Sequence, residues 1–330
     1  MKGLGQVIAA LCLSPLLALP AWAQDPIVIG YSSWAGWWPW AIAEAEGSFL
    51  KPMVPTSQLR WFDGYIESME AFAAGQLDGN TQTLNDTISF LDGSVNGQVV
   101  VLVNDNSAGN DKIIVREGIN TIEDLLGQRV AIEEGVVDDF LLALALTEAG
   151  YSRDDVTIVP LETGAAAAAF VAEQVDAVGA FPPFWLTALE RPGSQELISS
   201  ADFPGAIPDL LVVSQTLIDE QPDQVQALVN TWFDIRAFMA ENPERADEIM
   251  AERAGVSIEE LELFKDGTRF FTLEDNLEAF SPGDSMVHMP YAAQVMADFM
   301  VDVGFIPEVP DMSTLFDDRF VRTLAEQESP

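Results

Sequence analysis

The sequence predicts an α/β fold of two lobes, each a mainly parallel sheet flanked by helices, joined by crossing strands as in a hinged clamp. Short apolar segments alternate with helical ones from residue 27 to residue 181, which indicates parallel sheets. One motif also occurs twice, because residues 71–79 and 169–177 share the pattern A-F-x-A-x-Q-x-D-small. Chance similarity of two alanine-rich helices is the alternative explanation of this repeat.

The first lobe begins with a strand at 27–29, a tryptophan-rich loop, and a helix from about Pro39 to Gly47. A strand at 58–62 and a helix at 65–74, which Gly75 ends, follow. A third strand ends at 81–84, and 99–103 is a fourth, β-branched strand. This order predicts a sheet built from β/α units.

The same order then restarts. Thr121 and Asp124 predict a helix cap before a strand at 130–132, and Gly150 ends a helix at 137–149. A strand at 156–159, a helix at 165–173 and a strand at 178–181 complete the unit. A strand at 210–213 is expected to return to the first lobe.

The last third of the chain reads as helical. Pro222 and Pro243 fit first turns of helices, Ser257 begins a capping box, and 285–303 predicts a long helix bent at Pro290. We expect residues 24–104 and 210–330 to form the first lobe, and residues 105–209 to form the second.

Residues 1–23 read as a signal peptide. Lys2 precedes an apolar run at 7–19, and Ala-Trp-Ala at 21–23 predicts cleavage after Ala23. No later segment is long enough to span a bilayer, so no membrane insertion is expected. Leu11 precedes the single cysteine, Cys12, where a lipoprotein signal needs a small residue. We therefore expect a soluble exported protein.

The chain is strongly acidic, with 53 Asp and Glu against 15 Lys and Arg and a net charge of -38. Such a charge argues against nucleic-acid partners and against anionic membrane surfaces. The chain shows no cysteine nucleophile after the signal, no phosphate-binding glycine loop and no metal-ligand cluster, and its one histidine is His288. We expect no catalytic residue, no metal and no cofactor.

Ligands of open parallel sheets lie beyond the carboxyl ends of the strands. The loops at these ends carry aromatic and acidic side chains but no Lys, Arg or His. Aromatic faces with carboxylates predict a site for an organic cation, above all a guanidinium-like one. The candidate ligand-binding residues are Trp34, Trp37, Trp38, Asp63, Tyr65, Asp86, Glu134, Phe181 and Trp185. For any one of them, burial in the core, helix capping or solvation is the alternative, and helix N-termini could hold an anion instead.

Four segments resemble the substrate-binding proteins of nitrate, taurine and aliphatic-sulfonate importers, a family that includes thiamine-pyrimidine-synthesis-like proteins. The segments are I-G-Y-S-S-W-A-G-W-W-P-W (29–40), A-F-A-A-G-Q-L-D-G (71–79), T-I-E-D-L-L-G-Q-R-V-A (121–131) and A-F-V-A-E-Q-V-D-A (169–177). The resemblance covers residues 27 to 236. It implies a type II periplasmic-binding fold, a monomer in the periplasm, a small-molecule ligand, and an ABC permease and ATPase as partners.

A narrower resemblance rests on G-W-W-P-W (36–40), Y-I-E-S (65–68), N-D (85–86) and G-N-D (109–111). These segments resemble the urea-carboxylase-linked branch associated with guanidine import, which implies a guanidine-like cation as ligand. The sequence departs from that branch at 181–183, which is Phe-Pro-Pro, and in the acidic loop 133–139. The alternatives are the same clamp for a small anion (nitrate, taurine or another aliphatic sulfonate, bicarbonate), a receptor for a sensor kinase, and an enzyme.

Overall fold

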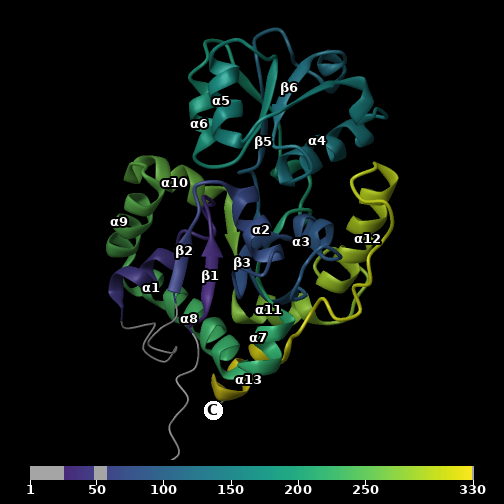
Figure 1. The fold of residues 1–330 in the computed structure, drawn as a ribbon. Coiled ribbons are helices and arrows are strands. Elements are labelled where there is room, and N and C mark those ends of the chain that lie inside the picture. The colour runs from purple at the N-terminus through teal and green to yellow at the C-terminus, as the bar shows by residue number, and fades with distance from the viewer. Residues whose placement is uncertain (1–25, 48–57, 329–330) are drawn as a thin grey trace, which may run out of the picture.

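The computed structural model describes residues 26–47 and 58–328. It contains two sheets, one above the other in Figure 1, each with helices beside it. The predicted two-lobed α/β fold is therefore confirmed. The predicted signal peptide and its cleavage site lie outside the described residues.

The first lobe holds a six-stranded sheet in the order β11-β4-β10-β3-β1-β2. β1 pairs in parallel with β2 and β3, whereas β10 runs antiparallel to β3 and β4. The strands are β1 (Val28–Tyr31), β2 (Gln58–Trp61), β3 (Gly79–Thr83), β4 (Val99–Ser107), β10 (Pro208–Val213) and β11 (Thr268–Phe270).

The second lobe holds a five-stranded sheet in the order β7-β6-β8-β5-β9. Here β6 pairs in parallel with β7 and β8, and β5 runs antiparallel to β8. The strands are β5 (Lys112–Val115), β6 (Arg129–Ile132), β7 (Thr157–Pro160), β8 (Ala177–Ala180) and β9 (Gln195–Ser199). The chain crosses between the sheets after β4 and before β10, and the boundaries predicted at 104 and 210 fall inside these two strands.

The sequence repeat has the same structural role in both lobes. Asp78 accepts a hydrogen bond from the backbone N–H of Val28 (2.8 Å), and Asp176 accepts one from Arg129 (3.1 Å). Each aspartate thus holds the first residue of the strand that pairs in parallel with both of its neighbours, β1 in the first lobe and β6 in the second. The preceding turns also match, because Gly75 (φ 73°) and Glu173 (φ 59°) both adopt left-handed backbone conformations. Such a conformation ends a helix.

Six helices follow the strands of the two β/α units. They are α1 (Trp40–Glu46), α2 (Tyr65–Ala73) and α3 (Leu84–Phe90) in the first lobe, and α4 (Val137–Glu148), α5 (Thr163–Val171) and α6 (Phe184–Leu189) in the second. Helix α3 was not predicted from the sequence, because Leu84 was interpreted as the end of a strand. Thr83 caps this helix by accepting a hydrogen bond from the Asp86 backbone N–H.

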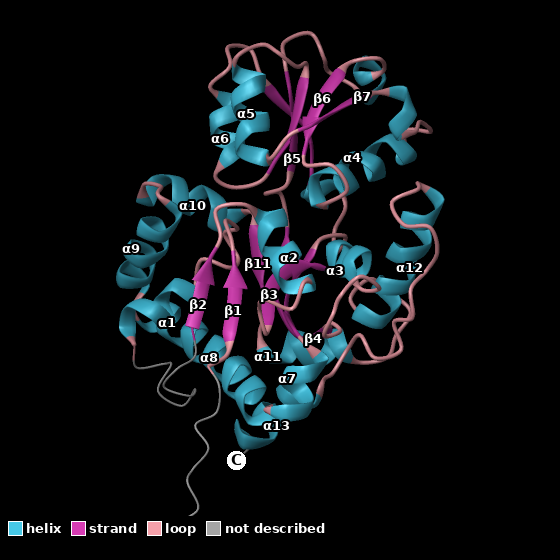
Figure 2. Ribbon diagram, viewed as in Figure 1, coloured by secondary structure: helices cyan, strands magenta, loops and turns pink. Residues whose placement is uncertain are grey.

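The C-terminal helices pack around the first lobe (Figure 2). Pro222 and Pro243 lie in first turns, and Ser257 forms the predicted capping box with Glu260. The long helix expected at 285–303 begins only at Met289, so Pro290 lies in its first turn and does not bend it. The helices are α7 (Gln215–Glu220), α8 (Pro222–Glu241), α9 (Pro243–Ala254), α10 (Ile258–Asp266), α11 (Leu273–Phe280), α12 (Met289–Asp302) and α13 (Arg319–Glu328).

The aromatic core of the first lobe links the tryptophan-rich loop to these helices. Trp232 of α8 is fully buried and lies 5.2 Å from the ring of Trp40. Trp38, also fully buried, meets the ring of Phe264 edge to face at 5.6 Å. In the part of the chain that the structure describes, no helix is long and apolar enough to cross a membrane.

Candidate functional site

A small pocket lies where the two lobes face each other, beyond the carboxyl ends of the parallel strands. Its empty volume, which includes space open to solvent, is about 230 Å³. Its lining comes from the first lobe (Ser33, Trp34, Trp37, Tyr65, Thr83, Asp209) and from the second (Asp111, Val137, Phe181).

Aromatic rings form the walls of this pocket. The ring of Tyr65 lies 5.5 Å from that of Trp37 and meets Phe181 of the second lobe edge to face at 6.3 Å. Trp34 meets Trp37 at 6.3 Å. The structure thus brings together four of the predicted ligand-binding residues.

Asp105 of β4 positions the tryptophan-rich loop. Trp34 Nε1 donates a hydrogen bond to Asp105 Oδ1 (3.0 Å). A Cβ atom on Gly36 would lie only 1.8 Å from Asp105 Oδ2, so no other residue fits there without a shift of the chain. The glycine in G-W-W-P-W therefore makes room for a buried carboxyl group.

The Asp86 carboxyl group lies behind the pocket and accepts hydrogen bonds from groups of both lobes. It accepts hydrogen bonds from the hydroxyl groups of Tyr65 and Thr83 (2.7 Å each) and from the Asn85 amide (2.6 Å). The backbone N–H of Val137, in the first turn of α4, also donates to it. Burial raises the pKa of Asp86 to about 7, although these bonds act to lower it. The hydrogen bond to Asp86 thus holds the Tyr65 ring in its position at the pocket wall.

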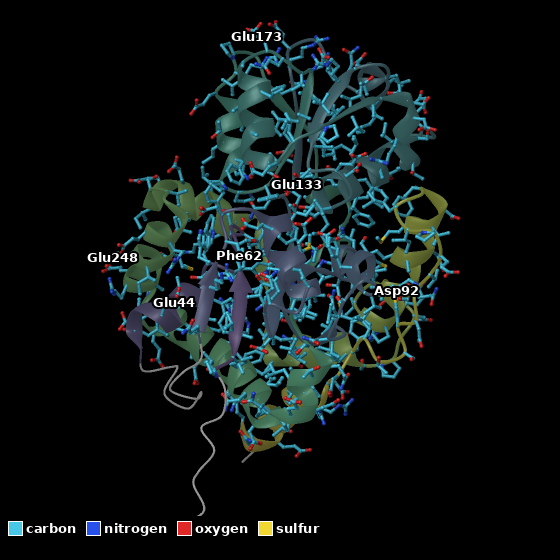
Figure 3. All side chains as sticks on the ribbon, viewed as in Figure 1. Glu44, Phe62, Asp92, Glu133, Glu173 and Glu248 are labelled. Atoms are coloured by element: carbon cyan, nitrogen blue, oxygen red, sulfur yellow. The ribbon has the colours of Figure 1, made fainter. Side chains whose placement is uncertain are left out.

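Glu133 makes the reciprocal contact from the second lobe, and Figure 3 shows it at the level where the lobes meet. It accepts a hydrogen bond from the Thr163 hydroxyl group (2.9 Å), and the backbone N–H of Ile66, in the first turn of α2, donates to it. Burial raises the pKa of Glu133. Each lobe thus places a carboxyl group at a helix N-terminus of the other, where the helix dipole favours negative charge.

The other predicted residues lie outside the pocket lining. The rings of Trp38 and Trp185 both pack against the ring of Phe264 in α10, with ring centres 5.6 and 5.3 Å from it. Asp63 accepts a hydrogen bond from Trp61 at the surface. Glu134 is half exposed and lies 3.6 Å from Arg153, which offers it a counter-charge in solvent.

Four buried aspartates that were not among the predicted ligand-binding residues lie in or beside the pocket: Asp105, Asp111, Asp138 and Asp209. Neither carboxyl oxygen of Asp138 has a hydrogen-bond partner among the described residues. Burial and neighbouring carboxylates raise its pKa well above the usual range. The available signal was an acidic residue directly flanking an apolar strand, as at Asp105 and Asp209.

A larger hollow of about 1050 Å³ lies near β11 and α11. Its described lining includes none of the buried side chains that lack a hydrogen-bond partner, so the pocket between the lobes is the stronger candidate. Across residues 26–47 and 58–328, no group of three or more His, Cys, Asp or Glu side chains is arranged to hold a metal ion.

Several solved structures share this fold. An alkanesulfonate-binding protein from Xanthomonas axonopodis pv. citri bound to MOPS matches with a TM-score of 0.74 at 18% identity, covering 89% of this chain and 98% of that one. The periplasmic nitrate-binding protein from Synechocystis PCC 6803 matches at 0.72 and 14% identity, with 92% and 89% covered. The desulfurization enzyme DSZB matches at 0.63 and 15% identity, with 92% and 100% covered. The fold therefore occurs in binding proteins and in an enzyme.

Sequence relatives give a narrower result. A Brucella abortus (strain 2308) protein named only as a binding protein is 29% identical over 273 residues, 81% of this chain and 82% of its own length. The taurine-binding periplasmic protein of Escherichia coli (strain K12) is 26% identical over 210 residues, 62% of this chain and 64% of its own length. The model of the NMT1-like family matches residues 22–254. This chain therefore belongs to the NMT1-like family.

Proposed function

We propose that this chain is the solute-binding component of an ABC importer, exported to the periplasm as a monomer, which captures a small molecule and catalyses nothing. The observation that carries the proposal is the pocket whose walls come from both lobes. The relatives named as binding proteins and as a periplasmic taurine-binding protein support it.

Closure of the lobes on the ligand is the mechanism. A ligand shifts such an equilibrium only if it binds the closed form more tightly than the open form. Phe181 and Asp111 supply that difference, because they add second-lobe contacts to a ligand already resting on Trp37 and Tyr65. The bonds of Asp86 and Glu133 to helix N-termini of the opposite lobe favour the same closed form.

The comparisons do not support the guanidine-like ligand expected from the sequence. The three binding proteins named above with a ligand are named for taurine, alkanesulfonate and nitrate, which fits the small-anion alternative better. The pocket lining contains no Lys, Arg or His, so an anion alone would depend on backbone N–H groups. Both ligand classes therefore belong in the first experiment.

Trp34, Trp37, Tyr65 and Phe181 are the proposed aromatic ligand contacts. Replacing Trp37 with Ala removes the ring that faces Tyr65 and should weaken ligand binding at least tenfold, since a stacked ring contributes about 0.5–1.5 kcal/mol beyond its buried area. Trp61→Ala is the matched control, because Trp61 lies outside the pocket and contacts Tyr31. Equal affinity of the Trp37 variant and the control would remove Trp37 from the site.

Thermal-shift screening followed by calorimetry tests the function itself. The probes are guanidine, methylguanidine, urea, agmatine, choline, nitrate, taurine and bicarbonate. One probe should bind at one molecule per chain and raise the melting temperature. At a ligand concentration a hundredfold above Kd, binding stabilises the folded state by about 2.7 kcal/mol. Chemical conversion of the bound probe would contradict the proposal and favour the enzyme alternative. Uptake of the identified ligand by cells with and without the gene separates transport from a sensory role.

A further inference from the structure

The four buried aspartates form one group beside the pocket, named here the aspartate cluster (Asp105, Asp111, Asp138 and Asp209). Asp105 and Asp209 lie opposite each other on the strands β4 and β10. Asp111 follows the first crossing between the lobes, and Asp138 lies in the first turn of α4. The cluster therefore draws on both lobes and on the connections between them.

The cluster carries more acceptor oxygens than the protein supplies with donors. Asp111 Oδ2 and both oxygens of Asp138 have no hydrogen-bond partner among the described residues, although both residues are at most 1% exposed. Asp105 Oδ2 and Asp209 Oδ2 also have no hydrogen-bond partner among the described residues, and burial together with the neighbouring carboxyl group of Asp105 raises the pKa of Asp209 well above its usual range. An unpaired buried carboxylate is strongly unfavourable, which makes this arrangement typical of a functional site.

The charged neighbours of the cluster are mostly further carboxyl groups. Those that act on it electrostatically are Asp86, Glu133, Asp139, Lys112 and Arg236. Lys112 donates to Glu196, and Arg236 lies 4.2 Å from the ring centre of Phe270. In the described residues neither cation forms an ion pair with the cluster. No ion pair among the described residues therefore compensates the carboxyl groups of the cluster.

The backbone is shaped around these carboxyl groups. A Cβ atom on Gly36 would meet Asp105 Oδ2 at 1.8 Å, and one on Gly179 of β8 would meet Asp138 Cβ at 2.9 Å. Glycine at these two positions, one in each lobe, lets the chain approach the acidic side chains closely. Each lobe thus has a glycine fitted to one member of the cluster.

One backbone N–H group in the first turn of each facing helix already bonds a carboxyl group of the opposite lobe. The first turn of α2 donates the Ile66 N–H to Glu133, and the first turn of α4 donates the Val137 N–H to Asp86. A simple anion entering the pocket would meet Asp111 and Asp209 without a basic side chain in the lining. Whichever of these carboxyl groups is ionised would repel it.

We propose that the ligand carries a positively charged nitrogen group with N–H donors, which Asp111 and Asp209 bind between the rings of Trp37, Tyr65 and Phe181. This inference rests on the proposed function, because it names the chemical class of the solute. Carboxylates accept charge-assisted hydrogen bonds from such a group, and aromatic faces attract its charge. An aminosulfonate such as taurine has this group together with an anionic end, so the inference accommodates a taurine-binding relative.

Two matched pairs of probes test the positive charge. Guanidinium and urea have similar shapes but differ in charge. Taurine has an ammonium group at the position where isethionate has a hydroxyl group. Within the pair that binds, calorimetry should find the nitrogen cation at least tenfold tighter. Equal affinities within that pair, tighter binding of nitrate than of every cation-bearing probe, or no binding of any cation-bearing probe would overturn the inference.

Proton linkage gives an independent readout. Burial raises the pKa of Asp111 to about 7, so a cation should displace protons when it binds. Its affinity should then rise up to about tenfold per pH unit for each linked carboxyl group between pH 5.5 and 7. Calorimetry in two buffers of different ionisation enthalpy measures the released protons. Proton uptake on binding would contradict the inference.

Matched variants locate the site. Asp111→Asn and Asp209→Asn should each weaken cation binding at least tenfold, whereas Asp92→Asn, an exposed acid in Figure 3, should leave it unchanged. Circular dichroism establishes that each variant folds. Unchanged affinity in both folded variants would overturn the inference. Saturable binding of an anion more tightly than of every cation-bearing probe would overturn it while supporting the proposed function, whereas turnover of the probe would overturn the proposed function itself.

Discussion

The two lobes place opposite chemistry at equivalent positions. Strand β1 of the first lobe is followed by the aromatic loop with Trp34 and Trp37, whereas its counterpart β6 is followed by acidic Glu133 and, in the first turn of α4, Asp138. At the ends of β3 and β8 the relation is reversed, with Asp86 in the first lobe and Phe181 in the second. Where the lobes meet, aromatic rings and carboxyl groups from both lobes line one pocket.

The features that the lobes share hold the backbone. Asp78 and Asp176 both accept a hydrogen bond from the first backbone N–H of the equivalent strands β1 and β6, and Phe72 and Phe170 are both buried in the repeated helix. The features that differ lie in the strand-end loops. The repeated segments therefore stabilise the fold, whereas the strand-end loops provide the side chains of the candidate site, as expected for a scaffold that positions functional loops.

The largest expected effect tests whether the repeat is structurally equivalent. Phe72 and Phe170 are 3% and 0% exposed, so Phe72→Ala and Phe170→Ala should each lower the free energy of unfolding by about 3–5 kcal/mol. Urea unfolding followed by circular dichroism measures the loss. Val95→Ala is the control, because Val95 is 72% exposed and should change stability by less than about 0.5 kcal/mol. A loss below 1 kcal/mol for one phenylalanine would break the equivalence.

The acidic side of the comparison predicts a pH dependence of stability. Burial raises the pKa of Asp86, Asp105 and Asp111 to about 7. Between pH 4 and 7 the folded state therefore binds more protons than the unfolded state, and the free energy of unfolding falls as pH rises. The slope is on the order of 1.4 kcal/mol per pH unit for each group.

Thermal unfolding of the ligand-free protein at pH 4.5 to 8 checks this slope. Asp111→Asn should make it shallower and raise the stability at pH 7.5, because the variant removes a buried charge. Asp92→Asn controls for the general repulsion of a chain with a net charge of -38. A slope that is the same in Asp111→Asn and in the wild-type protein would show that Asp111 does not titrate in this range.

The smallest expected effect separates the two repeated aspartates. Asp176 also pairs with Arg116 (2.7 Å), and although burial acts to raise its pKa, Arg116 and the Arg129 backbone N–H lower it. Asp176→Asn should cost about 1 kcal/mol at pH 7. That cost should vanish as pH falls through the lowered pKa of Asp176, because the wild-type carboxylate then takes up a proton. Asp78→Asn alters the matching strand contact, but among the described residues Asp78 has no arginine partner to lose. Thermal unfolding should therefore show a smaller loss of stability for Asp78→Asn than for Asp176→Asn. An equal or larger loss of stability would refute the role of Arg116.

The sequence by itself determined what depends on neighbouring residues: the alternation of strands and helices, the capping box at Ser257, the turn at Gly75, and the repeated Asp78 and Asp176. It also predicted that aromatic and acidic side chains meet at the strand ends. The missed helix α3 shows the limit of such reading, since a short apolar segment after a strand does not reveal by itself where the strand stops.

Only the tertiary structure decided which side chains face the ligand pocket. Trp37 lines it whereas the adjacent Trp38 packs against Phe264, and buried Asp138 replaces exposed Glu134 beside it. Adjacent residues in a turn or helix point in different directions, and their partners lie far away in the sequence. Trp34, for example, bonds Asp105, 71 residues along the chain. Composition shows that such groups exist, but the crossing of β4 and β10 between the lobes sets their positions.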